Sequence, residues 1–168
     1  MTPIPLSRDL SVRPGSPVPM SSWFSGTARD ATRSDDPSDL QRFVALQHAY
    51  RSTGGIVTGE SLTLLLREQV EQPISLLARW IVNREIVSLG WRGDVWLPVF
   101  QFDPAGVVQP GVRQIIAELS DAFDDWELAE WFAMPNCWLR GESPASAVGI
   151  GAPGVLQAAR ADRFVAMG

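Results

Sequence analysis

The 168-residue sequence contains no lysine, one cysteine and one histidine. Because Cys137 is the only cysteine, intramolecular disulfides and cysteine-based zinc sites are excluded, and the chain suits a reducing cytoplasm. Any Ser-His-Asp triad or histidine-rich metal site would have to use His48, to which we assign a structural role. We therefore expect no enzyme activity, no metal ion and no bound cofactor.

Long apolar runs are also missing from the sequence. No run approaches the roughly 20 residues that a membrane-spanning helix needs, and the first 20 residues lack the apolar core of a secretory signal. A composition of 45% hydrophobic and 20% charged residues is typical of soluble globular proteins. The sequence therefore predicts a cytoplasmic protein with no membrane partner.

Positive charge is scarce, since all fourteen basic residues are arginine and the formal net charge is -5. Residues 41–102 contain six arginines and five acidic residues, whereas residues 103–168 contain four arginines and nine acidic residues. DNA-binding proteins need a local excess of basic groups to neutralise phosphates. Only residues 41–102 carry a charge balance suited to DNA binding, and a dimer would bring two such segments to the DNA.

Residues 1–37 contain six of the thirteen prolines, with scattered serine, arginine and aspartate and no sustained helical or strand period. Such a segment buries too little apolar area to offset the entropy lost on ordering. We predict that residues 1–37 form a disordered, proline-rich arm.

Residues 38–103 are expected to form a winged helix-turn-helix-like module. Apolar residues recur at helical spacing over residues 40–50 and 58–66, and Pro73 suits the first turn of a third helix. After the third helix the pattern changes to short β-rich runs, with Gly93 between them as a hairpin signal. The order of three helices and a hairpin is that of a small winged module.

The third predicted helix separates polar from apolar residues. Ser75, Arg79 and Asn83 share one face, because they lie four residues apart. Arginine forms paired hydrogen bonds to guanine, and asparagine or glutamine does so to adenine. The alternative is an ordinary solvated face, which the nearby acids Glu85 and Asp94 favour. The candidate DNA-binding residues are Gln72, Ser75, Arg79 and Asn83, with Arg84 and Arg92 as candidate phosphate contacts.

Residues 104–168 are expected to form a helical C-terminal domain. Asp124 or Asp125 suits the N-cap of a helix, so the acidic residues nearby fit capping and solubility, or an acidic face for a basic partner. The strongest helical period begins at Pro110, with apolar residues at the spacing of a core-facing helix: Val112, Ile115, Ile116, Leu119 and Phe123.

A last helix is predicted from about Gly154 to Val165, with Val155, Ala158 and Val165 packed inward. The preceding run Gly149–Gly154 spells G-x-G-x-x-G, but no buried strand comes before it, so we interpret it as a helix lead-in. The expected fold class is thus mainly α with a small β-hairpin wing: a winged helix-turn-helix-like module followed by a helical domain.

The segment Trp131–Pro144, followed by the helix Val155–Val165, resembles the C-terminal domain of Xre/MbcA/ParS-type antitoxins over about residues 112–168. The segment from Ala78 to Asp103 is similar to a variant of that family in which a winged helix precedes the toxin-binding domain. The residues that carry the first resemblance are Pro135, Asn136, Leu139, Gly141 and Pro144.

The resemblance implies the antitoxin of a type II toxin-antitoxin pair. Such a protein neutralises a RES-type toxin, an enzyme that consumes NAD, by covering its active site, and it regulates its own gene through operator DNA. It implies a homodimer or a toxin-antitoxin hetero-oligomer. The candidate toxin-binding residues lie on the loop and the last helix: Asn136, Arg140, Glu142, Gln157, Arg160 and Arg163.

Three alternatives to this function stay open at the level of sequence. The chain could be a DNA-binding transcriptional regulator without a toxin partner, or a structural protein-interaction module. The last helix could also serve only to complete the core or a homodimer.

Overall fold

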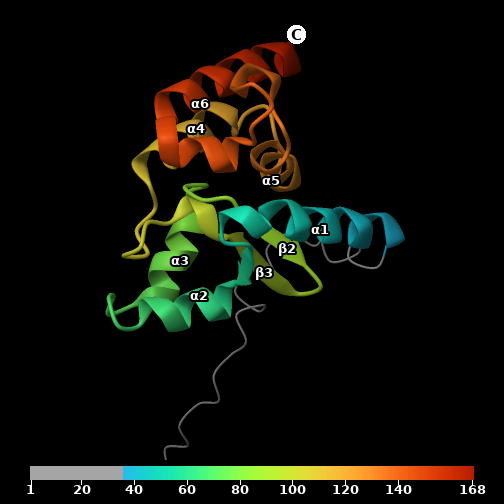
Figure 1. Ribbon diagram of the computed structural model, residues 1–168. Coiled ribbons are helices and arrows are strands. Elements are labelled where there is room, and N and C mark those ends of the chain that lie inside the picture. Colours follow the sequence, from blue (N-terminus) through green and yellow to red (C-terminus); the bar gives the residue numbers. More distant parts are fainter. Residues whose placement is uncertain (1–35) are drawn as a thin grey trace, which may run out of the picture.

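The computed structural model describes residues 36–168 (Figure 1). The predicted arm therefore lies outside the described residues, except for Asp36 and Pro37 at its end. Asp36 is the N-cap of the first helix and its side chain accepts a hydrogen bond from the backbone of Ser38 at 3.0 Å. Pro37 fills the first helical position, which needs no N–H donor, so the helix starts inside the predicted arm.

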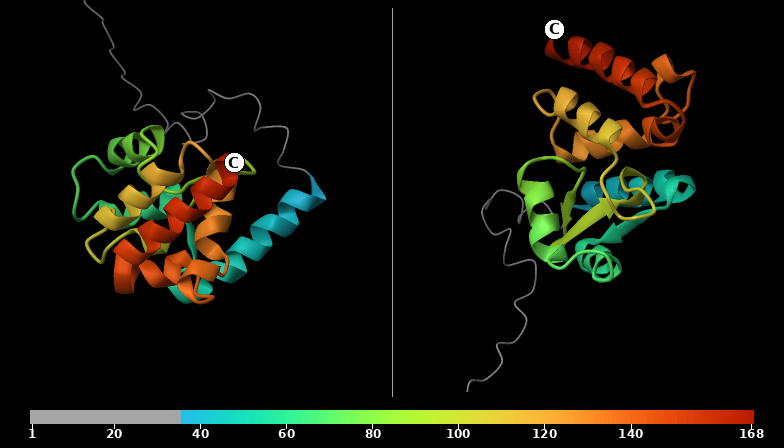
Figure 2. Two further views of the ribbon diagram at one scale, coloured as in Figure 1. Left: turned by 90° about the horizontal axis from the view of Figure 1, so that it is seen from above. Right: turned by 90° about the vertical axis from the view of Figure 1, so that its left-hand side faces the viewer.

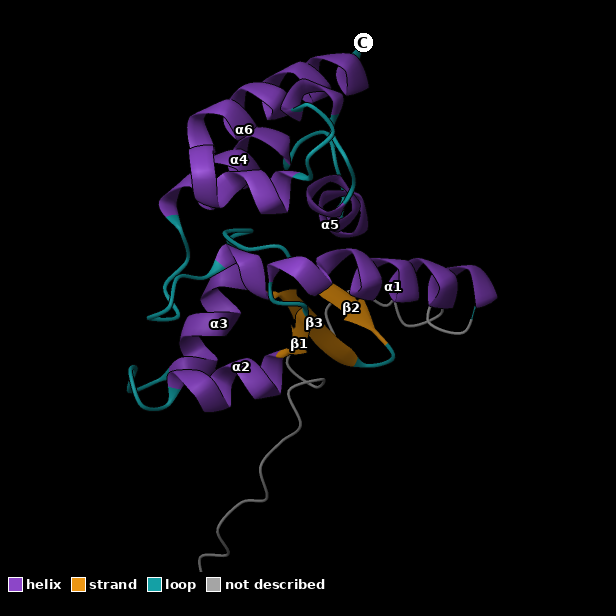
Figure 3. Ribbon diagram, in the orientation of Figure 1, coloured by secondary structure: helices purple, strands orange, loops and turns teal. Residues whose placement is uncertain are grey.

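The N-terminal half contains three α-helices and a three-stranded antiparallel sheet with the strand order β1-β3-β2 (Figure 3). The predicted hairpin is confirmed, because β2 and β3 pair through a two-residue turn at Arg92 and Gly93. Both turn residues have positive φ angles, 52° and 82°, as a type I′ turn requires. The elements are α1 (Pro37–Ala49), η2 (Tyr50–Thr53), β1 (Ile56–Thr58), α2 (Gly59–Leu66), α3 (Pro73–Val82), β2 (Leu89–Trp91), β3 (Asp94–Pro98) and η3 (Val99–Gln101).

The C-terminal half is helical, which confirms a mainly helical chain with a small sheet. None of the helices in residues 36–168 is long and apolar enough to cross a lipid bilayer. Helices α4 and α6 lie side by side (Figure 2), and a Cβ on Gly111 of α4 would come within 2.5 Å of the Cβ of Ala152 of α6. The elements are α4 (Pro110–Leu119), α5 (Asp125–Ala133), η4 (Cys137–Leu139) and α6 (Pro144–Met167).

The last helix differs from the prediction at both ends. A first helical segment begins at Pro144, where Ser143 caps it by accepting a hydrogen bond from the backbone of Ser146, and the segment after the kink at Gly151 starts close to the predicted position at about Gly154. The glycine-rich run lies inside α6 and produces a kink at Gly151. Val165 was expected in the core but is 73% exposed, because α6 extends beyond the short helix α4 that covers it.

Two buried clusters join the two halves of the chain, and the larger one surrounds α4. The apolar face of α4 packs against side chains from both halves. The predicted domain boundary between residues 103 and 104 therefore stays a prediction. The hydroxyl of Tyr50 donates a buried hydrogen bond of 2.7 Å to the carbonyl oxygen of Ala129 in α5. Members of the larger cluster include Leu46, Tyr50, Val87, Leu89, Phe100, Val112, Ile115, Ile116, Leu119, Leu128, Phe132 and Val155.

Tyr50→Phe tests this junction. Burial raises the pKa of the Tyr50 phenol well above its usual value, so the hydroxyl stays protonated and donates. We expect its loss to lower the free energy of unfolding by about 1–1.5 kcal/mol, measured by urea denaturation. Circular dichroism and tryptophan fluorescence should follow one transition in the wild type. An unchanged stability, or separate transitions for the two signals, would contradict a shared core.

Candidate functional site

The exposed face of α3 holds the predicted polar residues. Ser75 and Arg79 are exposed, whereas Leu77 and Trp80 on the opposite face are buried. Gln72 is the exposed N-cap residue of the helix. This separation agrees with the sequence pattern. Two further exposed residues of α3, Ile74 and Val82, are apolar. The spacing of the polar residues did not predict that these two side chains would be exposed.

Asn83 and Arg84, at the end of α3, take part in internal contacts. The Asn83 amide donates a hydrogen bond of 3.0 Å to the carboxylate of Glu85. The Arg84 guanidinium donates to the carbonyl oxygens of Ser120 at 2.8 Å and Phe123 at 3.1 Å. These hydrogen bonds occupy part of the guanidinium and direct it toward the end of α4.

Arg92 lies at the tip of the hairpin and is exposed. Its guanidinium sits 4.6 Å from the ring centroid of Trp91. A cation held over an aromatic face keeps its N–H donors directed outward. Of the two predicted phosphate contacts, Arg92 is the more exposed, and its side chain forms no ion pair within residues 36–168.

Asn136 was predicted as a toxin contact, but it is 8% exposed and serves the fold instead. Its side-chain oxygen accepts from the backbone of Trp138, and its amide donates to Asp162 at 2.6 Å. Asp162 also accepts from the indole N–H groups of Trp131 at 2.8 Å and Trp138 at 3.0 Å. We call these four residues the Asp162 cluster. It fixes the α5–α6 loop against α6, a long-range role that the motif alone does not reveal.

Arg140 and Glu142 are exposed in the same loop. Arg140 has a φ of 58° and ends η4, and Gly141 follows with a φ of 85°. Beside them is an open hollow of about 460 Å³ lined by Trp138 and Ile150, both exposed apolar side chains. This part of the predicted surface is therefore accessible.

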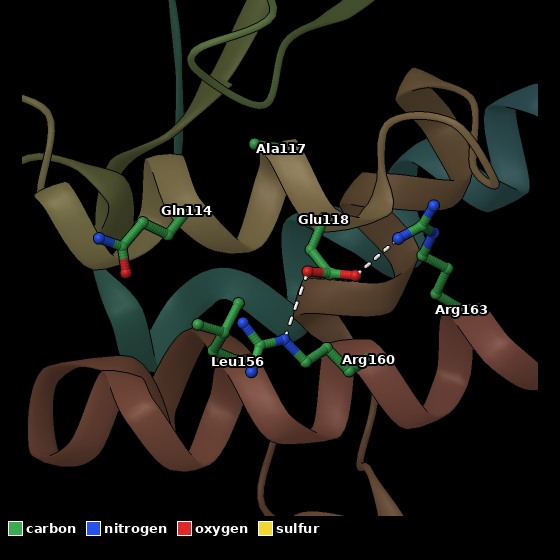
Figure 4. A pocket seen from close by; sticks show the side chains of 6 residues that line it. All are labelled: Gln114, Ala117, Glu118, Leu156, Arg160 and Arg163. Carbon is green, nitrogen blue, oxygen red and sulfur yellow. Dashed lines mark hydrogen bonds and ion pairs between the residues drawn. The ribbon is translucent and has the colours of Figure 1, made fainter.

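Arg160 and Arg163 are paired within the protein (Figure 4). Both approach the carboxylate of Glu118 on α4, at 3.4 Å and 2.8 Å, on one side of a shallow pocket of about 490 Å³. The pKa of Glu118 is lowered, chiefly by the hydrogen bond from Arg163, against the opposing effect of its desolvation. The third predicted residue of this helix face, Gln157, is exposed.

The last turn of α6 is exposed, although Val165 within it was predicted to lie in the core. Phe164 is 78% exposed and Met167 is 59% exposed, next to the exposed Val165. The apolar residues of α6 continue to its end, so the sequence does not indicate where the helix stops being covered by α4. An apolar surface of this kind is typical of a protein-binding site.

Comparison of the chain with known protein families, with curated proteins and with solved structures finds no match. Residues 36–168 contain no group of three or more histidine, cysteine, aspartate or glutamate residues able to hold a metal ion. The candidate sites are exposed regions in the two halves of the chain: the outer face of α3 and the hairpin tip in the first half, and the outer face of α6 with the adjoining loop in the second.

Glu118→Gln tests the pairing of α4 with α6. The folded-state pKa of Glu118 is lowered, so its carboxylate stabilises the protein above the usual glutamate pKa, and this contribution is lost as the pH falls through the lower folded-state value. We expect the wild type to be more stable than the variant near about pH 7 and the difference to disappear near about pH 3, measured by urea denaturation. A difference that does not change with pH would contradict the assignment.

Proposed function

We propose that this protein is an antitoxin that binds a RES-type toxin, an enzyme that consumes NAD, and neutralises it by covering its active site. The observation that carries the proposal is the apolar end of α6, where Phe164, Val165 and Met167 are exposed together. The resemblance of the Trp131–Pro144 segment to antitoxins supplies the class of partner. The proposal gives this chain no catalytic role and a location in the cytoplasm.

The support of α6 favours tight binding by this surface. The Asp162 cluster ties the helix to the α5–α6 loop, and the pairs of Glu118 with Arg160 and Arg163 tie it to α4. A surface that is already ordered loses little conformational entropy when a partner docks on it. Phenylalanine and methionine, which are exposed at this end of α6, are enriched in protein–protein interfaces.

Charge also favours the proposed partner. A toxin that cleaves NAD has to bind its phosphates, so the opening of its active site is expected to be cationic. Residues 103–168 contain nine acidic residues against four arginines. Glu142 is exposed beside the Trp138 hollow and suits such an opening, whereas Asp162 is occupied by its own cluster. Complementary charge would speed the encounter and orient the two proteins.

We propose in addition that the N-terminal half is a winged helix that binds operator DNA. The observation favouring this function is the element order α1-β1-α2-α3-β2-β3 with the sheet order β1-β3-β2, in which α3 would be the recognition helix and the β2–β3 hairpin the wing. A homodimer would present two such helices and double the basic groups facing DNA. A regulator without a toxin would use the same half.

The two proposed surfaces lie at opposite ends of the molecule. In Figure 1 and in the right-hand view of Figure 2, α6 is at the top and α2 is at the bottom, with α3 above α2 in the lower half. A toxin on α6 would therefore leave α3 accessible to DNA.

Neutralisation is tested by the double variant Phe164→Ser and Val165→Ser. Both side chains are exposed, so the melting temperature should change little, whereas affinity for the co-encoded toxin should fall at least about tenfold because buried apolar contacts are lost. The readouts are binding to the purified toxin and its rate of NAD consumption with the antitoxin present.

The matched control is Leu64→Ser with Leu65→Ser, which makes the same kind of change to exposed residues of α2. We expect this control to neutralise like the wild type. A folded Phe164/Val165 variant that still suppresses NAD consumption at wild-type concentrations would show that the end of α6 is not the toxin-binding surface. Arg160→Glu with Arg163→Glu is less informative, because it would place three acidic side chains together at Glu118.

DNA binding is tested by Arg79→Ala and Arg92→Ala in the full chain. Arg79 on α3 should contribute to base recognition, so its loss should reduce the preference for the sequence upstream of the gene over unrelated DNA. Loss of Arg92 should weaken binding to all duplexes and reduce the slope of log affinity against log salt by about one. Electrophoretic mobility shifts at several salt concentrations measure both effects. Binding that does not depend on salt, or the absence of binding, would contradict the proposal that the N-terminal half binds DNA.

A further inference from the structure

We infer that Arg84 is a positioning residue, which holds α3 against α4 and α5 and so supports DNA binding without contacting DNA. This inference rests on the proposed DNA-binding function of α3. The sequence pattern assigns Arg84 to a phosphate contact, whereas the structure supports a role in positioning α3.

The backbone of Arg84 is the first observation. The backbone N–H of Glu85 donates to the carbonyl of Trp80 at 2.8 Å, and that of Arg84 donates to Ile81 at 3.0 Å. These two hydrogen bonds form a Schellman motif, whose left-handed residue is usually glycine. Arg84 occupies that place with a φ of 52°. A side chain other than glycine is disfavoured in this conformation and persists where its surroundings compensate.

The side chain of Arg84 provides the compensation. Its guanidinium donates to Ser120, the C-cap of α4, and to Phe123 in the α4–α5 connection. It also pairs with the carboxylate of Asp125, the first residue of α5, at 3.1 Å. The last carbonyls of a helix lack partners within the helix, so a cationic fork is well suited to them. One side chain thus links the end of α3 to both helices.

Glu85 forms a second link at the same place. Its carboxylate accepts from Asn83 and pairs with Arg113 of α4 at 3.4 Å. The charges at the end of α3 are therefore balanced within the protein: Arg84 faces Asp125, and Glu85 faces Arg113. A balanced arginine adds little to the attraction of DNA phosphates. Its contribution to binding is to the orientation of α3.

The test uses the full chain and a duplex from directly upstream of its own gene. Arg84→Gly keeps the left-handed backbone and removes the fork, whereas Arg84→Lys keeps the charge and loses the paired geometry. We expect both variants to bind the duplex about tenfold more weakly than the wild type, with an unchanged salt slope. Arg92→Ala is the control for a phosphate contact, with a slope reduced by about one.

A variant on the other side of the link separates orientation from charge. Asp125→Ala makes the chain less acidic, so a purely electrostatic effect would strengthen DNA binding. Because Asp125 helps to hold Arg84, we expect Asp125→Ala to weaken binding several-fold instead. Circular dichroism and thermal unfolding establish that each variant is folded at the assay temperature.

The outcomes distinguish this inference from the function on which it rests. Wild-type affinity in both Arg84 variants would overturn it, and so would stronger binding by Asp125→Ala. If Arg84→Lys binds like the wild type while Arg84→Gly loses affinity with a reduced salt slope, Arg84 contacts a phosphate and the inference is wrong. If the wild type itself fails to bind the duplex, the DNA-binding function fails, and the positioning role falls with it.

Discussion

Burial of the apolar face of α4 is the constraint on which the rest of the structure depends. Val112, Ile115, Ile116 and Leu119 are fully buried, and they belong to a cluster that contains side chains from α1, the sheet, α5 and α6. The packing holds α6 on one side of α4 and the N-terminal half on the other. α6 packs in this cluster, whereas the buried residues of α3, Leu77 and Trp80, belong to a second buried cluster formed with α2 and β3. Arg84 links the end of α3 to the end of α4, and Glu118 links α4 to α6.

Features that depend on local chemistry were predictable from the sequence. The predicted period of α4 is confirmed for Val112, Ile115, Ile116 and Leu119, which lie on one helix face, whereas Phe123 falls in the α4–α5 connection because the helix ends at Leu119. Asp124 caps α5 with a capping box completed by Glu127, and Gly93 forms the hairpin turn. Each of these signals depends on residues within one or two turns of the chain.

Features that depend on distant partners were not predictable. Arg84 and Arg163 were predicted to face ligands, but their acceptors lie 36 to 45 residues away in the chain. Asn136 was predicted as a toxin-binding residue, but it is 8% exposed and hydrogen-bonds Asp162 across 26 residues. Charge and polarity show that such side chains need partners, and only the packing shows that the partners are internal. In the same way, the exposure of Val165 depends on the length of α4 relative to α6.

The central claim is that toxin and DNA bind to opposite ends of one body. Amide hydrogen exchange of the full chain, measured alone, with the co-encoded toxin and with the upstream duplex, tests it most directly. We predict that the toxin slows exchange in α6 and the α5–α6 loop, and that the duplex slows exchange in α3 and the β2–β3 turn. Protection of α3 by the toxin with α6 unchanged, or of α6 by the duplex with α3 unchanged, would contradict the account.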